Sequence, residues 1–135
     1  MTLSKKIKGS IAELSVAARL LSEGWRVLFP FGEDCQYDLA AERAGKFIRV
    51  RVKYTTPRNG ALEVNFRSSN NWSVIRYSLK EIDFVAAYDS ATEKIYFIPA
   101  SETKRSSFKL RFARTRNNQI NKVNLAENFS QFLPN

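Results

Sequence analysis

Residues 46–54 constrain the fold of this chain more than any other stretch, because apolar and basic side chains alternate along most of them. The apolar set is Ile48, Val50, Val52 and Tyr54, and the basic set is Arg49, Arg51 and Lys53. A period of two predicts a β-strand with one buried face and one cationic face. Stacked cations repel one another, so the basic face either splays into solvent or lies beneath anions. We expect Asp38 and a phosphate backbone above it.

Residues 4–23 are predicted to form an amphipathic helix that ends at Gly24. Apolar residues recur there at spacings of 4, 3, 4 and 3, namely Ile7, Ile11, Leu14, Ala18 and Leu21. Glu13 lies with Ala17 and Leu20 on the row flanking this stripe, where its carboxylate can reach the edge of the covered sheet. The alternative for Glu13 is a capping box with Ser10, but the apolar period already begins before that position.

Four further segments are predicted to be strands, at residues 25–29, 37–42, 83–88 and 94–99. The last two are joined by a turn at residues 89–92 and are expected to form a second, non-catalytic half of the sheet. Their apolar side chains are expected to belong to the core.

Two more helices are predicted. Residues 77–82 fit a short helix, and the spacing of Leu125, Phe129, Phe132 and Leu133 fits a closing helix that covers either the sheet or a partner subunit. The length of the chain and the lack of a linker predict a single domain over residues 1–135.

Composition limits the classes of function. Twenty-two Lys and Arg against thirteen Asp and Glu give a net charge of +9, which favours nucleic acid as a partner over a merely soluble basic protein. The absence of histidine excludes Ser-His and Cys-His catalysis and imidazole metal sites. The single cysteine, Cys35, is expected to be an inert thiol. No long apolar run and no signal peptide core occur, so we expect a cytoplasmic protein without a membrane span.

Residues 57–77 are predicted to contact DNA. Asn59 and Gly60 are a strong turn signal, and the alternation after them suggests a two-stranded ribbon of the kind that fits the major groove. A polar loop that only turns the chain is the alternative. Basic residues in the C-terminal third suit phosphate contact. The predicted DNA-binding residues are Lys8, Arg49, Arg58, Asn59, Asn65, Arg67, Ser69, Asn70, Asn71, Arg76, Arg114, Arg116, Asn118 and Gln119.

The chain resembles the PD-(D/E)xK nuclease superfamily in the order of four features. These are a helix with Glu13, a strand with Asp38, a strand with Lys53, and the segment 77–85. Residues 51–55 are similar to the Gln-x-Lys variant of the group I intron homing endonucleases of cyanobacteria, and residues 114–119 and 125–129 are similar to the tail of that group. The resemblance covers most of the chain, and its specificity comes from the combination of short motifs. It implies an α/β fold with a restriction-endonuclease-like core, in which helices flank a mixed central sheet.

The resemblance also implies a metal-dependent DNA endonuclease. Asp38 would be the metal-binding carboxylate, with Glu13 and the Val52 carbonyl as further ligands. Lys53 would position or help to deprotonate the attacking water and stabilise the pentavalent phosphate. Phosphodiester hydrolysis uses a hard, oxygen-ligated cation, usually Mg²⁺, and a positive charge where negative charge develops.

Arg51 departs from the family pattern, which has Gln, Glu or Asp at this position. A guanidinium has five donors and no acceptor, so it cannot ligate a cation and repels one. It could instead replace the metal by pairing with Asp38 and reaching the scissile phosphate. We therefore expect a chain that binds DNA well and cuts poorly or not at all, and the sequence does not decide whether Arg51 is natural or introduced.

The implied function is that of a site-specific homing endonuclease acting on double-stranded DNA. A chain of 135 residues spans few base pairs, so a long target implies a homo-oligomer, either a dimer or a tetramer. One alternative is a non-catalytic DNA-binding protein on a nuclease fold, which Arg51 favours. Another is a repair or junction-resolving nuclease of the same fold, which would prefer branched DNA to one long duplex sequence.

Overall fold

The computed structural model describes residues 2–32, 34–69, 74–76, 81–102, 107–113 and 124–134, with the backbone alone at 67–69 and 74–76. One α-helix and two short 3-10 helices accompany the strands of the described part. The helical elements are α1 (Lys5–Ser22), η1 (Ala100–Glu102) and η2 (Ala126–Phe129). The strands are β1 (Arg26–Leu28), β2 (Leu39–Arg43), β3 (Lys46–Thr55), β4 (Ala61–Asn65), β5 (Arg67–Ser69), β6 (Val74–Arg76), β7 (Phe84–Asp89), β8 (Ile95–Pro99), β9 (Ser107–Arg111) and β10 (Asn124–Leu125).

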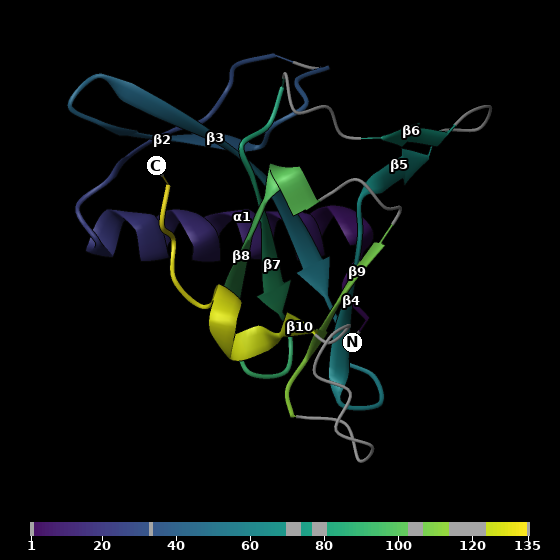
Figure 1. Ribbon diagram of the computed structural model, residues 1–135. Coiled ribbons are helices and arrows are strands. Elements are labelled where there is room, and N and C mark those ends of the chain that lie inside the picture. The colour runs from purple at the N-terminus through teal and green to yellow at the C-terminus, as the bar shows by residue number, and fades with distance from the viewer. Residues whose placement is uncertain are drawn as a thin grey trace.

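The main sheet has the strand order β1-β2-β3-β7-β8, and α1 lies across one of its faces (Figure 1). The pairing of β3 with β7 is parallel, whereas the other pairings in this sheet are antiparallel. The ten-residue strand β3 is therefore central, and its bounds agree with the predicted strand at residues 46–54 to within one residue. A mixed sheet covered by a helix confirms the predicted α/β class.

The ends of α1 agree with the sequence prediction. Ser4 is the N-cap, and its Oγ accepts a hydrogen bond of 3.2 Å from the Ile7 amide. Gly24, with φ of 88°, takes the left-handed conformation that follows the last turn. The hydroxyl of Ser10 donates to the Lys6 carbonyl inside the helix, so Ser10 is not a cap. The capping-box alternative for Glu13 is therefore wrong.

The buried face of α1 is not the one predicted. Its buried residues are Ala12, Val16, Ala17 and Leu20, whereas Ile7, Leu14 and Leu21 are 51%, 64% and 58% exposed. The stripe predicted as the core face is wrong, because α1 has apolar residues on two faces. The small side chains of Ala12 and Ala17 allow the helix to lie close to the sheet. The row predicted to flank the stripe is the one that meets the sheet, and it carries Glu13.

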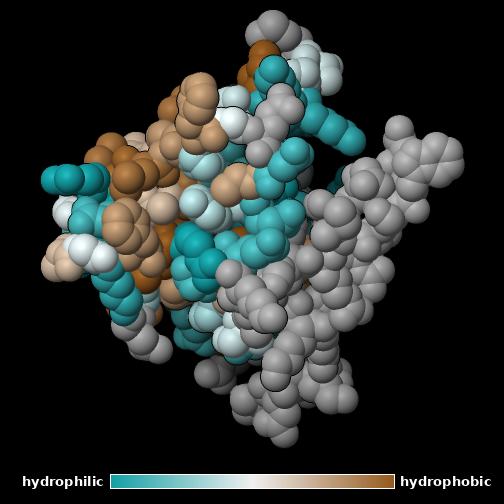
Figure 2. Space-filling view, turned by 90° about the horizontal axis from the view of Figure 1, so that it is seen from above, coloured by the Kyte–Doolittle hydropathy of each residue, from teal (hydrophilic) through white to brown (hydrophobic). Residues whose placement is uncertain are grey.

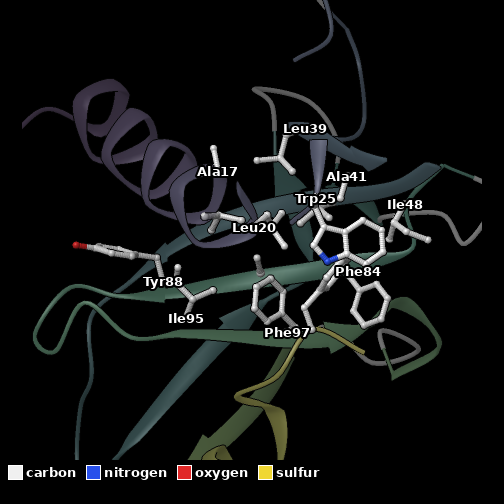
Figure 3. Packing of buried hydrophobic residues seen from close by; sticks show 14 of the residues in the cluster. Ala17, Leu20, Trp25, Leu39, Ala41, Ile48, Phe84, Tyr88, Ile95 and Phe97 are labelled. Carbon is white, nitrogen blue, oxygen red and sulfur yellow. The ribbon is translucent and has the colours of Figure 1, made fainter. Parts of the chain in front are cut away.

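The core beneath α1 is rich in aromatic side chains. Trp25, Leu39, Ile48, Phe84 and Phe97 pack there against the helix (Figure 3). The apolar face of β3, from Ile48 to Tyr54, belongs to this cluster as predicted.

A second core lies on the opposite face of the main sheet. Leu62 and Phe66 pack there with Val85, Ile98 and Leu110, under a three-stranded sheet of order β10-β9-β4. Within the described residues, a small sheet rather than a further α-helix thus covers this face, which is where the structure differs from the predicted helical flanks.

The C-terminal segment does not form the predicted closing helix. Only the four-residue η2 is helical, and an extended tail follows. Phe132 leaves this tail and enters the first core, with its ring centroid 5.2, 5.1 and 5.0 Å from those of Trp25, Phe84 and Phe97. Leu133 is 72% exposed. The segment packs against the sheet on both faces, through Phe132 in the first core and through Ala126 and Phe129 of η2 in the second.

The turn at Asn59 and Gly60 is present, with φ of 52° and 74° and a bridge between Arg58 and Ala61. It is the primed turn that these residues favour. However, β4 pairs with β9 rather than with β3, and the hairpin that follows is formed by β5 and β6. Of the predicted helix at 77–82, residues 77–80 lie outside the described part, and Glu81 is in a turn.

The remaining strand predictions are confirmed to within two residues. The turn between β7 and β8 is held by Asp89, whose Oδ1 accepts from the amides of Ala91 and Thr92. No helix among the described residues is both long and apolar enough to cross a membrane.

Candidate active site

Asp38 occupies the junction between the loop after β1 and the first residue of β2. Its amide donates to the Val50 carbonyl at 2.9 Å, and its Oδ2 accepts from the Val52 amide at 2.7 Å. These two bonds continue the β2–β3 pairing by one step beyond Leu39. They fix the carboxylate beside the middle of β3, and the side chain is only 18% exposed.

Arg51 reaches this carboxylate from the basic face of β3. Its Nε lies 3.6 Å from Asp38 Oδ2, and its Nη1 donates to the Gln36 carbonyl at 3.4 Å. The Arg51 side chain is 25% exposed, so the pair is partly shielded from solvent. The predicted pairing of Arg51 with Asp38 is thus present in the structure.

Glu13 meets the same carboxylate from α1. Burial raises the pKa of Glu13 to about 7, and the negative charge of Asp38 and a hydrogen bond between the two carboxyl groups act in the same direction. The positive charge of Arg51 opposes this rise. Glu13 therefore holds its proton more tightly than an ordinary carboxyl group, because an ionised Glu13 would repel the neighbouring carboxylate.

Val52 and Lys53 follow Arg51 in β3. In an extended strand the N–H and C=O of one residue point to the same neighbour, so the Val52 carbonyl is directed to the side where its amide meets Asp38. Lys53 is half-buried and shares the strand face of Arg51. The structure thus brings Glu13, Asp38 and Arg51 into contact, with Lys53 two residues further along.

A pocket of about 270 Å³ opens beside the two acids. Its lining combines Glu13 and Asp38 with residues of the loop between β1 and β2, namely Phe29, Pro30, Gly32, Asp34, Cys35 and Tyr37. Asp34 and Tyr37 were not among the predicted site residues, and Cys35 was expected to be an inert thiol. This loop directly precedes Asp38 in the sequence, and Gly32 and Asp34 in it take positive φ, 100° and 65°.

Arg49 was predicted to contact a DNA phosphate, but its partner in the structure is Asp83. Its backbone amide and Nε both donate to Asp83 Oδ2, at 2.8 and 3.0 Å, and its Nη2 donates to Oδ1 at 3.2 Å. Burial raises the pKa of Asp83, but these hydrogen bonds and the guanidinium charge outweigh that effect and lower it. Asp83 also donates its amide to the Arg49 carbonyl and accepts from the Ala100 amide, so this pair ties β3 to β7 and β8.

The predicted DNA-binding residues fall into three groups. Arg58, Asn59 and Asn65 are exposed around β4, and Lys8 lies with its Nζ 5.7 Å from the centre of the Tyr54 ring. Arg67, Ser69 and Arg76 lie in the β5–β6 hairpin, at the right of Figure 1, where the backbone alone is described. Asn70, Asn71, Arg114, Arg116, Asn118 and Gln119 lie outside the described residues.

The surface is uneven in polarity. Figure 2 shows hydrophobic groups gathered at the left of the view and hydrophilic groups through its middle. Exposed large apolar side chains away from α1 include Leu28, Phe29, Phe31 and Phe47.

Glu13 and Asp38 supply the oxygen ligands that Mg²⁺ prefers, but the positive charge beside them does not suit a cation. Two carboxyl groups and a main-chain carbonyl supply hard oxygen atoms. However, the guanidinium of Arg51 lies against Asp38, and no three His, Cys, Asp or Glu side chains in the described part of the chain are grouped to hold a metal ion. A divalent cation at this place would meet a fixed positive charge. The residues present therefore do not fit a bound divalent metal.

Comparison with known proteins agrees with the fold. A family model described as PD-(D/E)XK endonuclease matches residues 3–132. The bacterial homing endonuclease I-Ssp6803I is similar in structure, with a TM-score of 0.71, 29% sequence identity, and coverage of 87% of this chain and 84% of that chain. A Holliday junction resolvase, Archaeoglobus fulgidus Hjc, matches with a TM-score of 0.48 and 15% identity over 94% of this chain and 99% of that one, a similarity too slight to indicate function. No curated protein matches the chain.

Proposed function

Because the chain belongs to the PD-(D/E)XK endonuclease family, we propose that it is a site-specific double-stranded-DNA-binding protein of the homing endonuclease type whose phosphodiester hydrolysis is suppressed by Arg51. The observation that carries this proposal is the ion pair between Arg51 and Asp38. It places a permanent positive charge at the carboxylate that a nuclease of this family would use for its metal.

The charge of the chain supports DNA as the ligand. A net charge of +9 attracts a polyanion, and the exposed Arg58, Asn59 and Asn65 supply a guanidinium and two amides near one edge of the fold. Amide side chains can pair with base edges, whereas the guanidinium suits phosphate as well as guanine.

The geometry of the acidic site supports the following proposed roles. In a cleaving form, Asp38, Glu13 and the Val52 carbonyl would hold Mg²⁺, and Lys53 would stabilise charge at the scissile phosphate. In this chain Arg51 neutralises Asp38 directly, so the carboxylate attracts a cation less strongly. Arg51 and Lys53 together would then hold a DNA phosphate without an ion that activates water.

A long DNA target implies an assembly larger than one chain. We propose a homo-oligomer, either a dimer or a tetramer, that acts in the cytoplasm as one domain over residues 1–135.

Cleavage selection tests this function. The parent chain and its Arg51→Gln variant are incubated with a random-sequence duplex library and Mg²⁺, and cut ends are sequenced. The proposal expects cutting at one long site by Arg51→Gln and little or none by the parent. Arg49→Gln is the matched control, since it removes an arginine from the same strand face without freeing Asp38. Equal cutting by parent and Arg51→Gln would overturn the proposed role of Arg51.

The second candidate is a DNA-binding protein that has lost cleavage altogether. The same Arg51–Asp38 pair favours it. Selective binding of one duplex by both proteins, with no cutting by either, would support this candidate. Selective binding of branched DNA over every linear duplex would contradict both candidates.

A further inference from the structure

Phe31 is the most exposed large apolar side chain of the described structure. It is 106% exposed, so almost nothing in the described residues covers its ring, whereas Phe29 is 52% exposed. Both residues belong to the loop between β1 and β2, which lies at the top of the view in Figure 1. A single exposed apolar residue is common at protein surfaces, so it is the position of Phe31 that matters.

The residues on either side of Phe31 line the pocket of the acidic site. Pro30 and Gly32 both belong to this lining, together with Glu13 and Asp38. Adjacent Cα atoms lie about 3.8 Å apart, so the Cα of Phe31 is within one residue of the pocket wall while its ring stands clear in solvent. Under the proposed function a DNA phosphate is held at this site, and the bases attached to it then lie beside the ring of Phe31.

The backbone that presents the ring is restricted on both sides. Pro30 has its φ fixed near about −65°, and Gly32 has a φ of 100°, which L side chains rarely adopt. The far end of the loop is tied to β3, because Arg51 Nη1 donates to the Gln36 carbonyl at 3.4 Å. A Phe side chain has only two χ angles, so a ring presented in this way loses little conformational entropy when it binds.

The charges of the loop favour contact with bases over contact with phosphates. Residues 27–42 contain no Lys or Arg, and Asp34 is exposed in the same loop. Phosphate groups are held by basic side chains, whereas an uncharged aromatic ring can stack on a base. A protein partner would instead require a continuous apolar patch, but the exposed Gly32 and Asp34 interrupt the apolar surface after Phe31.

We propose that Phe31 inserts between two neighbouring base pairs of a bound DNA duplex, beside the phosphate at Arg51 and Lys53. This inference rests on the proposed function and adds to it a residue that selects the base step. Apolar side chains that enter a duplex in this way partly unstack the step and kink the helix. Pyrimidine–purine steps unstack most easily, so Phe31 favours such a step at its position.

Base unstacking is tested on the duplex that the parent enriches by binding from a random-sequence library. 2-Aminopurine, whose fluorescence rises when it is unstacked, replaces one base of this duplex at a time. The parent is expected to raise the fluorescence at one step, or at two symmetry-related steps, whereas Phe31→Ala is not. Phe31→Ala is also expected to bind the duplex more weakly by on the order of 10-fold to 100-fold.

The dependence of affinity on salt separates stacking from phosphate contact. Phe31→Ala is expected to leave this dependence unchanged, since no phosphate contact is lost. Phe31→Leu keeps an apolar wedge and should retain part of both the affinity and the fluorescence rise.

Phe47→Ala is the matched control, since Phe47 is 57% exposed on β3 and lies outside the loop. It should leave the affinity and the fluorescence rise unaltered. The Tm of Phe31→Ala should equal that of the parent, because the ring is exposed, and misfolding is then excluded as the cause of weaker binding.

Equal binding by the parent and Phe31→Ala, or a fluorescence rise that persists in Phe31→Ala, would overturn the inference and leave the proposed DNA binding intact. A change in the sedimentation of the DNA-free protein on Phe31→Ala would also overturn it, because the ring would then contact another chain. Failure of the parent to enrich any duplex would contradict the proposed function itself, and the inference with it.

Discussion

The guanidinium of Arg51 lies against the carboxylate of Asp38, with 3.6 Å between Nε and Oδ2. Asp38 is at the same time fixed by the Val52 amide and forms a side-chain hydrogen bond with Glu13. The Arg51 guanidinium, the Val52 amide and the Glu13 carboxyl group thus all interact with the Asp38 carboxylate. This is the place where the PD-(D/E)XK family would bind its metal. The charge that Arg51 brings is permanent, so it decides the chemistry of this site.

Replacement of Arg51 by glutamine is expected to create a magnesium site. The amide oxygen can ligate a cation, and the charge that repels it is removed. Millimolar Mg²⁺ should then stabilise Arg51→Gln by about 1 to 3 kcal/mol, seen as a rise of a few degrees in Tm, and leave the parent unchanged. Differential scanning fluorimetry measures this.

The control for that experiment is Arg51→Gln combined with Asp38→Asn, which removes the main carboxylate ligand. It should respond to Mg²⁺ no more than the parent does. A magnesium-dependent rise in Tm of the parent itself would show that Arg51 does not exclude the metal.

Glu13 is expected to make the folded state less stable as pH rises. Its pKa is about 7 in the folded protein, above the ordinary value of 4.5, so between these values the folded state holds a proton that the unfolded state has released. Stability from this group is complete below pH 4.5 and is lost as pH rises through 7. Urea denaturation at pH 5 and pH 8 should show a smaller fall for Glu13→Gln than for the parent. The exposed Glu63, replaced by Gln, serves as control and should leave the fall unchanged.

Phe132 is expected to anchor the C-terminal tail. It is 5% exposed and contacts three core aromatic rings, so Phe132→Ala should cost about 3 to 5 kcal/mol of unfolding free energy. Leu133→Ala, at a neighbouring position that is 72% exposed, should change it by less than about 0.5 kcal/mol. Chemical denaturation distinguishes the two, and similar losses would contradict the described packing.

Asp83 is expected to hold the start of β3 against β7. Asp83→Asn weakens the charged hydrogen bonds from Arg49, and since both side chains are about one-third exposed, the expected loss is about 1 to 2 kcal/mol. Its pKa is lowered, so this stabilisation exists above pH 3.8 and is lost as pH falls below that value. A denaturation midpoint unaffected by Asp83→Asn at pH 7 would show that the pair is not structural.

Much of the site could be predicted from the sequence, because its elements are local. The alternation along β3 placed Arg51 and Lys53 on one face, and the position of Glu13 on the helix directed it to the sheet. Each of these follows from a fixed backbone period over a few residues. The loop over the pocket could not be predicted, because Asp34 and Tyr37 belong to no periodic element.

The sequence by itself determined the bounds of α1 and the two unlike faces of β3, since caps, glycine and side-chain alternation act over one or two turns of chain. Only the tertiary structure decided which apolar face of α1 meets the sheet, that Asp83 takes Arg49, and that Phe132 enters the core from an extended tail. The spacing of apolar residues shows that a helix has unlike faces, but packing against residues distant in sequence decides which face is buried. In α1 the small Ala12 and Ala17 fit close to the strands, and the larger Leu14 and Leu21 are left in solvent.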